Sequence, residues 1–215
     1  MVEESVEGRL RDLIQDLKES AEDFVEGFQM AIEMSEVKEI ARRMAVTNSF
    51  DSILTMLGVL IGSYVSGLRD PRVVINVFLG GALAIAMSGT LGTYMTERAE
   101  RVSKVKELET AVLMDLDETI VGKAEKISAL LIALISGITP ALVVLSLTVP
   151  FVIAELRLLS LEHAFMISIG ETLAIMFFIG VYLGKISKEN KVLYGFVYVA
   201  LGIILLLVMT SLGVD

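Results

Sequence analysis

The sequence predicts an all-α polytopic membrane protein with five transmembrane helices, a cytoplasmic N-terminus and acidic amphipathic helices on the cytoplasmic side. Hydrophobic residues make up 54% of the 215 residues, and the mean hydropathy is +0.73, which is too apolar for a soluble domain of this length. Charged residues are still 21% of the chain, so they must be segregated from the apolar runs. The runs lie near 45–68, 73–96, 127–153, 163–184 and 192–213, and about 20 apolar residues suffice for one crossing.

Lysine and arginine residues predict how the five spans are oriented. Fifteen of the 18 fall in three segments on one side, which are 1–44, 97–126 and 185–191. The opposite side carries only three arginines. Because membrane proteins concentrate positive charge in their cytoplasmic loops, we expect the N-terminus inside and the C-terminus outside.

The composition divides the chain into four segments. They are an acidic amphipathic cytoplasmic helical segment at 1–44, transmembrane helices 1 and 2 at 45–96, an acidic cytoplasmic helical connection at 97–126, and transmembrane helices 3 to 5 at 127–215. The third apolar run is long for one crossing and contains Pro140 and Pro150. We therefore expect this run to kink or tilt.

An apolar stripe at helical spacing marks residues 8–43 as an amphipathic helix. Its members are Leu10, Leu13, Ile14, Leu17, Ala21, Phe24, Val25, Phe28 and Ile32. The stripe requires a partner, which is expected to be the cytoplasmic ends of the spans, segment 97–126 or another protomer. The opposite face is acidic and continues to Glu33 and Glu36.

Small residues recur at four-residue spacing in the first three spans. They are Gly58 and Gly62, then Gly80, Ala84, Ser88 and Gly92, then Ala129, Ala133 and Gly137. Such stripes allow helices to approach closely in lipid. Each stripe is expected either to pack within the chain or to form a dimer face.

The composition also excludes several classes of function. The absence of cysteine excludes disulfides, thiolate metal sites, iron–sulfur clusters and thiol catalysis. The single histidine, His163, excludes a multi-histidine metal site within one chain, and the net charge of −9 disfavours nucleic acid as a partner. We find no phosphate-binding glycine loop, nucleophile elbow or zinc-protease motif. We therefore expect no enzyme, and any transport must be driven by a gradient.

Two carboxylates, Asp51 and Glu171, lie inside spans. An ionised group near the bilayer centre costs roughly 2.5–3.5 kcal/mol or more, so such residues indicate an ion or proton path. Asn48 and Thr55 share the helix face of Asp51 and add oxygen atoms suited to a metal ion, although a polar cluster at the membrane interface is the alternative. Glu171 is expected to relay protons or to be a neutral, hydrogen-bonded group, because burial disfavours the charged form.

Twenty of the 27 acidic residues fall in 1–44 and 97–126. The candidate metal ligands there are Glu33, Glu36, Glu97, Glu100, Glu107, Met114 and Glu118. Carboxylates three or four residues apart on a helix can bind one cation together, and thioethers such as Met114, or Met87 in the second span, favour a softer ion such as Fe²⁺. The alternatives are a solvated charged face and ordinary packing of the methionines.

Three segments resemble the vacuolar iron transporter family, whose members move Fe²⁺ or Mn²⁺ out of the cytosol. In 48–62, Asn-Ser-Phe-Asp-Ser and Gly-Val-Leu-Ile-Gly look like the first-span motifs of the family. Residues 88–100, Ser-Gly-Thr-Leu-Gly-Thr-Tyr-Met-Thr-Glu-Arg-Ala-Glu, are similar to its Ser-Met-Gly-x-Gly-Glu-Tyr-x-Ser-x-x-x-Glu. Residues 137–140, Gly-Ile-Thr-Pro, resemble its third-span Gly-Ala-x-x-Pro, and the similarity covers about 44–215.

The resemblance implies a homodimer whose ion path lies near the two-fold axis and includes Asp51. The family's second-span methionine falls on Gly89, with Met87 two residues earlier, and the glutamate of its Gly-Glu-Tyr is Thr93 here. The segment between spans two and three is shorter than in the family. The nearest matches to the early glutamates of that segment are Glu100, Glu107 and Glu109.

The sequence therefore predicts proton-coupled transport of a divalent transition metal, Fe²⁺ or Mn²⁺, out of the cytosol across the cytoplasmic membrane. Asp51 would bind the ion and, with Glu171, relay protons, and no permanently bound cofactor is expected. The expected partners are the metal ion, the lipid bilayer and a second copy of the chain. Two other functions stay open: a membrane-anchored module that binds a partner through the N-terminal helix, and a proton-coupled carrier of small solutes.

Overall fold

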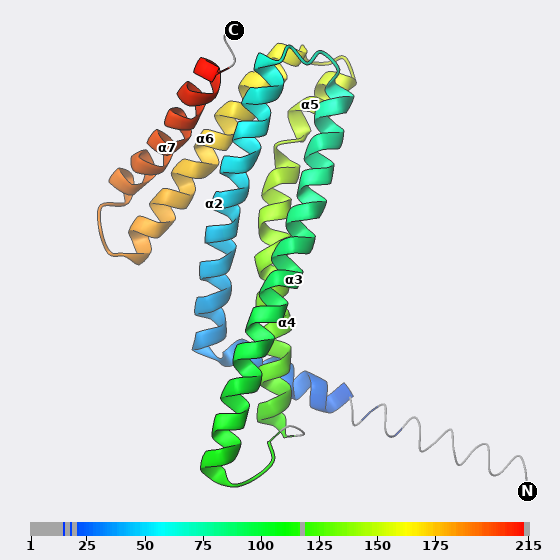
Figure 1. Cartoon of the computed structure of the whole chain (residues 1–215), viewed down its shortest axis with the longest axis vertical. Helices are drawn as coiled ribbons and strands as arrows, with labels where there is room; N and C mark the ends of the chain where they lie inside the picture. Colours follow the sequence, from blue (N-terminus) through cyan, green and yellow to red (C-terminus); the bar gives the residue numbers. More distant parts are fainter. Residues whose placement is uncertain (1–14, 16–17, 19–20, 117–118, 213–215) are drawn as a thin grey trace, which may run out of the picture. The chain divides into compact units, whose positions relative to one another are not determined.

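The computed structural model describes residues 15, 18, 21–116 and 119–212, and all regular secondary structure in them is helical (Figure 1). Residues 21–33 are helical and precede the labelled elements. These are α2 (Ser35–Val65), α3 (Pro71–Val112), α4 (Ile120–Ser146), α5 (Val149–Glu155), α6 (Leu161–Ile186) and α7 (Lys191–Leu212). The predicted all-α class is confirmed.

Five segments are long and apolar enough to cross a membrane, namely α2, α3, α4 together with α5, α6 and α7. The chain is therefore a polytopic membrane protein, as predicted. Both α2 and α3 extend past the predicted apolar runs: α2 begins at Ser35, and α3 continues to Val112. The second span thus continues into the charged connection as one helix.

The long third run is divided at Leu147 and Thr148 into α4 and α5. Pro140 lies inside α4 without ending it, whereas Pro150 lies in the first turn of α5. Proline has no N–H, so the carbonyl of Ser146 lacks its regular donor four residues later. The expected kink or tilt takes the form of a break before Pro150.

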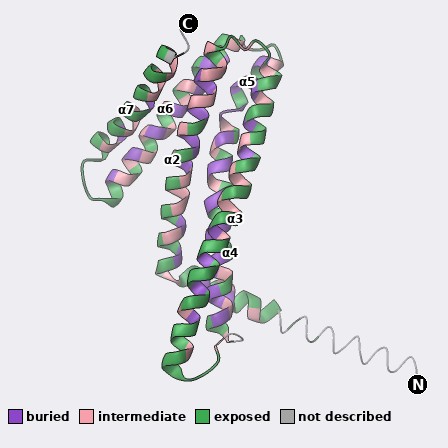
Figure 2. Ribbon diagram, in the orientation of Figure 1, coloured by how far each residue is buried: buried purple, intermediate pink, exposed green. Residues whose placement is uncertain are grey.

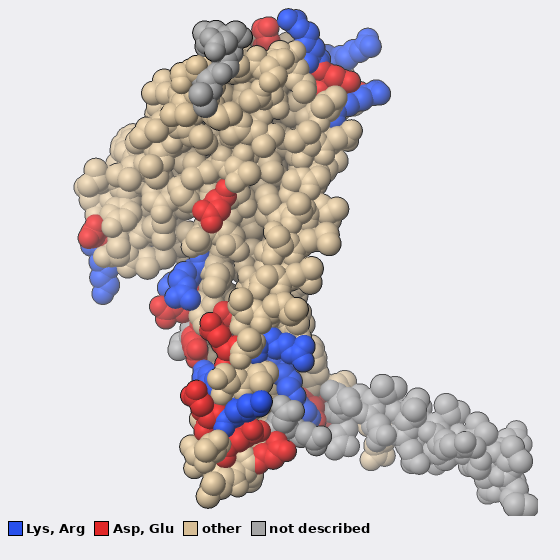
Figure 3. All heavy atoms as spheres, in the orientation of Figure 1, with Lys and Arg blue, Asp and Glu red and all other residues tan. Residues whose placement is uncertain are grey.

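The chain forms two compact units. Unit 1 comprises Met1–Arg42 and Gly92–Ala133, and unit 2 comprises Arg43–Leu91 and Leu134–Asp215. Charged side chains gather over unit 1, whereas the face of unit 2 in Figure 3 is mostly uncharged between the ends of its helices. Unit 2 therefore presents the apolar surface that a lipid environment requires.

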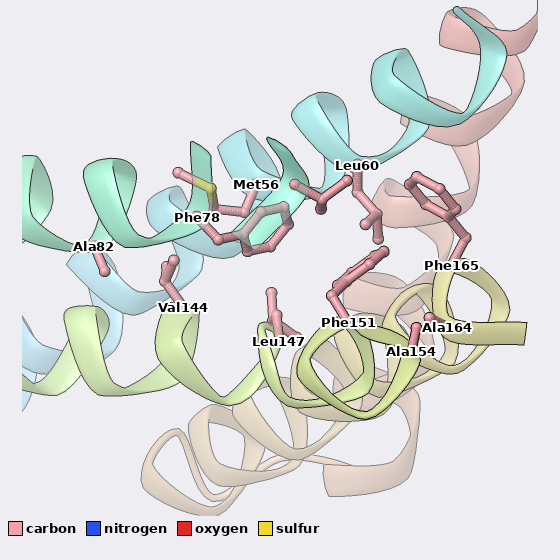
Figure 4. Close-up of a cluster of buried hydrophobic side chains, with 11 residues drawn as sticks. Met56, Leu60, Phe78, Ala82, Val144, Leu147, Phe151, Ala154, Ala164 and Phe165 are labelled. Carbon is pink, nitrogen blue, oxygen red and sulfur yellow. The ribbon is translucent and has the colours of Figure 1, made fainter. Parts of the chain in front are cut away.

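An aromatic core joins α3, α5 and α6 in unit 2 (Figure 4). The ring centroid of Phe151 lies 6.0 Å from that of Phe78 and 5.0 Å from that of Phe165. The Phe151–Phe165 pair is edge to face, an arrangement that contributes about 0.5–1.5 kcal/mol beyond burial. Leu147 belongs to the same cluster, so the break between α4 and α5 is held against this core.

The predicted apolar stripe of the N-terminal segment is not the face that packs within the described part of unit 1. Gly27 and Ala31 are buried there, and a Cβ on Gly27 would lie 3.1 Å from Ile127 Cδ1. The helix formed by residues 21–33 is mostly exposed in Figure 2, and Phe24 and Val25 on it are more than half exposed. Small residues form this contact because they allow the backbone to approach α4. Four members of the stripe lie outside the described residues, namely Leu10, Leu13, Ile14 and Leu17.

Candidate ion-binding site

Asp51 lies in the apolar part of α2 with its side chain exposed on the surface of the chain. Its carboxylate forms no hydrogen bond or ion pair with any described residue. Thr55 Oγ1 donates to the backbone oxygen of Asp51 at 2.8 Å, so this hydroxyl bonds the helix itself. A carboxylate in hydrocarbon is costly, and Asp51 therefore requires a proton, a cation, water or another copy of the chain.

Asn48 connects α2 to α4 inside unit 2. Its Nδ2 donates to Ser136 Oγ at 2.6 Å and to the Ser136 carbonyl at 3.2 Å. The amide nitrogen of Asn48 is thus engaged by α4, while Asp51 is exposed, and the expected convergence of Asn48 Oδ1 and Asp51 on one cation stays a prediction. Within the chain, Asn48 helps to fix the position of α2 against α4.

The glycines of α3 divide between two faces of the helix. A Cβ on Gly89 would lie 2.9 Å from Gly137 Cα in α4, and one on Gly81 would lie 2.4 Å from Met56 Cε in α2. A Cβ on Gly80, by contrast, would have no atom within 4 Å. The stripe of small residues predicted in this span is exposed on the surface of the chain; its members are Gly80, Ala84, Ser88 and Gly92.

Other small residues of the predicted stripes are used within the chain or remain open. Ala129 and Ala133 are fully buried, and a Cβ on Gly137 would lie 2.1 Å from Thr90 Oγ1. Gly58 in α2 has open space around it. Met87, a candidate ligand two residues before the position of the family's methionine, is 55% exposed on α3. The α4 stripe is thus an intrachain contact, whereas α2 and α3 keep small, uncovered positions.

A buried ion-pair network occupies unit 1. Arg101 pairs with Glu125 through Nη1, and its Nε lies 3.5 Å from Glu97 Oε2. All three side chains are at most 6% exposed. Glu97, predicted as a metal ligand, is therefore neutralised by an arginine. The spacing of four residues between Glu97 and Arg101 could have indicated this pair. The pairing of Arg101 with Glu125 on α4 could not be predicted, because the sequence around Glu125 gives no sign of which residue it contacts.

The other acidic candidates of unit 1 are dispersed. Glu36 Oε2 lies 2.6 Å from Lys104 Nζ, and Glu109 accepts a hydrogen bond from the Leu116 N–H at 3.0 Å. Four more candidates have exposed side chains, namely Glu33, Glu100, Glu107 and Met114, and Glu118 lies outside the described residues. Within the described ranges, no three Asp, Glu or His side chains are placed to hold a metal together.

Glu171 is half-buried near the middle of α6. Its Oε1 accepts a hydrogen bond from Ser146 Oγ at 2.7 Å, at the end of α4. Ser168 and Thr172 are fully buried on the same helix. Ser168 Oγ donates to the Leu147 carbonyl at 3.1 Å, so α6 supplies polar groups to the break between α4 and α5.

Unit 1 also contains a cavity of about 1010 Å³ between α3 and α4. Its charged lining residues are Arg98, Arg101, Lys106, Glu109, Asp115, Glu125 and Lys126. Arg98 lies over the ring of Tyr94, 5.9 Å from its centroid. The mixture of cations and anions, several of them paired with one another, does not favour a divalent cation at this place.

No model of a known protein family matches this chain, and no solved structure matches it. The chain is 35% identical to uncharacterized protein MJ0645 of Methanocaldococcus jannaschii over 166 residues, which are 75% of this chain and 83% of that protein. The chain belongs to the family of this archaeal protein. The name of the relative states no activity, so a functional conclusion rests on the residues of the chain itself.

Proposed function

We propose that the protein is a proton-coupled transporter that moves a divalent transition metal, Fe²⁺ or Mn²⁺, out of the cytosol. The observation that carries this proposal is Asp51, a carboxylate exposed within the apolar part of α2 and without a partner in the described chain. A cation that neutralises it, or a proton in exchange, removes the cost of a charge in lipid. The resemblance of the first two spans to vacuolar iron transporters supports the same function.

A homodimer would complete the ion site. One Asp51 cannot neutralise a divalent ion, and among the described residues no three acidic or histidine side chains gather to hold a metal within one chain. Two copies that meet along α2 and α3 would bring two aspartates together, and the open positions at Gly58 and Gly80 allow a close approach of that kind. Met87 on the exposed surface of α3 would add a thioether that favours a softer ion such as Fe²⁺ over Mg²⁺ or Ca²⁺.

The acidic residues predicted on the cytoplasmic side would raise the local concentration of cations. Glu33, Glu100 and Glu107 suit this role because they are exposed. Glu36 and Glu97 suit it less, because Lys104 and Arg101 already neutralise them. Capture of cations by these residues is a diffuse electrostatic effect and requires no single binding site.

Metal flux into liposomes tests the role of Asp51. The full-length protein and Asp51→Asn are reconstituted, and Fe²⁺ and Mn²⁺ flux is measured with and without a pH gradient. We expect flux that follows the gradient in the wild type and is lost in the variant, because an amide can neither take up the proton nor balance the metal charge. Glu162→Gln, which alters an exposed carboxylate at the start of α6, is the control and should keep full flux. Wild-type flux in Asp51→Asn would remove this residue from the mechanism.

A second function is favoured by the exposed apolar side chains of residues 21–33. Phe24, Val25 and Ile32 are 42–54% exposed, as expected of a helix that binds a cytosolic protein while the spans serve as an anchor. Absence of metal flux in correctly inserted protein would support this function. Deletion of residues 1–40 separates the two, since a transporter should keep some flux without them.

A further inference from the structure

The break between α4 and α5 places polar groups inside an apolar unit. Pro150 removes the regular donor of the Ser146 carbonyl, and Ser168 on α6 donates to the next carbonyl, that of Leu147. Irregular backbone at membrane depth is tolerated where it is buried in protein or lines a polar cavity, and interrupted spans are where many transporters bind the ions that drive them. Glu171 is the carboxylate that faces this break.

Ser146 can satisfy Glu171 in both of its protonation states. Its Oγ lies 2.7 Å from Glu171 Oε1 and 2.8 Å from the carbonyl oxygen of Val143. A hydroxyl has one hydrogen and two acceptor lone pairs, so Ser146 donates to one of these oxygens at a time. When Glu171 is ionised, the hydrogen points to the carboxylate. When Glu171 is protonated, Glu171 donates to Ser146 Oγ and the Ser146 hydrogen turns to Val143.

We infer that Glu171 and Ser146 form the proton site that couples transport to the pH gradient, an inference that rests on the proposed function for the identity of the transported ion. Uptake adds one proton from water to a Glu171 carboxylate oxygen, and the new O–H bonds Ser146 Oγ. On release, that proton returns to water, and the Ser146 hydroxyl turns back to donate its hydrogen bond to the Glu171 carboxylate. The exchange requires only that the Ser146 hydroxyl rotate, so little rearrangement opposes the cycle. Ser146 is a positioning residue, and Glu171 carries the proton.

The other titratable groups on the elements packed against α6 do not bond Glu171. Those that lie in unit 2 are Arg43, Asp51 and Tyr64 on α2, Glu155 on α5, and Lys191, Tyr194 and Tyr198 on α7. Glu155 pairs with Arg72, and the Tyr64 ring packs on Phe165. Among the described residues, the hydrogen bond of Ser146 is the polar contact of the Glu171 carboxylate. Ser146 is therefore the side chain that would respond to a proton on Glu171.

Infrared spectroscopy tests the proton site without relying on transport. Full-length protein in liposomes is titrated with acid while the carboxylic acid C=O stretching band is recorded. Because the other carboxyl groups of the chain also gain protons in acid, we expect one reversible component of this band to be lost in Glu171→Gln and kept in the control Glu162→Gln. Ser146→Ala should keep this component at an altered frequency, because the protonated carboxyl loses its acceptor, and Ser146→Thr should restore it. A band that persists unchanged in folded Glu171→Gln would overturn the proposal.

Flux measurements then test coupling. In Glu171→Gln, metal flux should no longer respond to the pH gradient, while Glu162→Gln should behave as wild type. Gradient-driven flux of normal size in Glu171→Gln would show that the proton travels elsewhere and would overturn the coupling role. If the wild type moves neither Fe²⁺ nor Mn²⁺, the proposed function fails, whereas the infrared band still decides whether Glu171 binds a proton reversibly.

Discussion

Arg101 lies between the carboxylates of Glu97 and Glu125, and all three side chains are nearly excluded from solvent. A cation in this position neutralises two buried anions at once. Lys104 lies nearer the surface: its pair with Glu36 leaves both side chains at least 40% exposed, and its Nζ lies 3.4 Å from Glu125 Oε1. The two cations of one helix therefore differ in how much the fold depends on them.

Replacement of these two residues should separate a buried pair from an exposed one. Arg101→Ala removes the cation that lies between two buried carboxylates and should destabilise the protein by about 3–5 kcal/mol. Lys104→Ala should cost less, because its exposed pair with Glu36 contributes only about 0–1 kcal/mol and Arg101 still pairs with Glu125. Thermal unfolding in detergent measures both. Equal, small losses would mean that solvent reaches the Arg101 cluster.

At the scale of helices, α3 packs on α4 through backbone rather than through side chains. A Cβ on Gly137 would lie 2.5 Å from the carbonyl oxygen of Ala86 and 2.1 Å from Thr90 Oγ1. The α3 backbone at Ala86 and the Thr90 side chain could make room for such a Cβ only if α3 moved away from α4. The contact explains why Gly89 of α3, where the resembling family has methionine, carries no side chain here.

Gly137→Ala should therefore separate α3 from α4. We expect a loss of about 1–3 kcal/mol, the usual cost of overpacking. Gly170→Ala is the matched control, because its Cβ would meet no atom within 4 Å and alanine favours the helix by about 1 kcal/mol. Unfolding midpoints of the two variants should move in opposite directions. A fully stable Gly137→Ala would contradict the close approach of the helices.

At the scale of the whole molecule, the charge distribution predicts orientation and the absence of cysteine allows a clean test of it. Single cysteines can be placed at Ser103 in the acidic connection and at Leu158 between α5 and α6. Both positions are exposed, Leu158 by 77%. The positive-inside rule places Ser103 in the cytoplasm and Leu158 outside.

Labelling with a membrane-impermeant maleimide checks this orientation. In intact cells, Leu158→Cys should react and Ser103→Cys should not, and both should react after lysis. The cysteine-free wild type is the control and should not react at all. The reverse pattern would invert the topology and, with it, the direction proposed for metal movement.

The sequence alone determined the fold class, the five spans and the two intramembrane carboxylates, because hydrophobic length and the cost of a charge in lipid are local properties. It also indicated irregularity in the third span, since a proline lacks its N–H wherever it stands. Only the tertiary structure decided what each candidate contacts. Asn48 bonds Ser136, 88 residues away, and Glu171 bonds Ser146, 25 residues away.

Contacts of that kind depend on how helices pack, and one helix's sequence does not encode its neighbour's register. For the same reason, the stripes of small residues in α3 and α4 differ in what covers them. Their spacing is equal, yet Gly137 packs against α3 and Gly80 has open space around it. It also explains why Glu97 is paired with arginine while Asp51 is not paired within the described chain. Spacing identifies which residues share a face, and packing determines which face is covered.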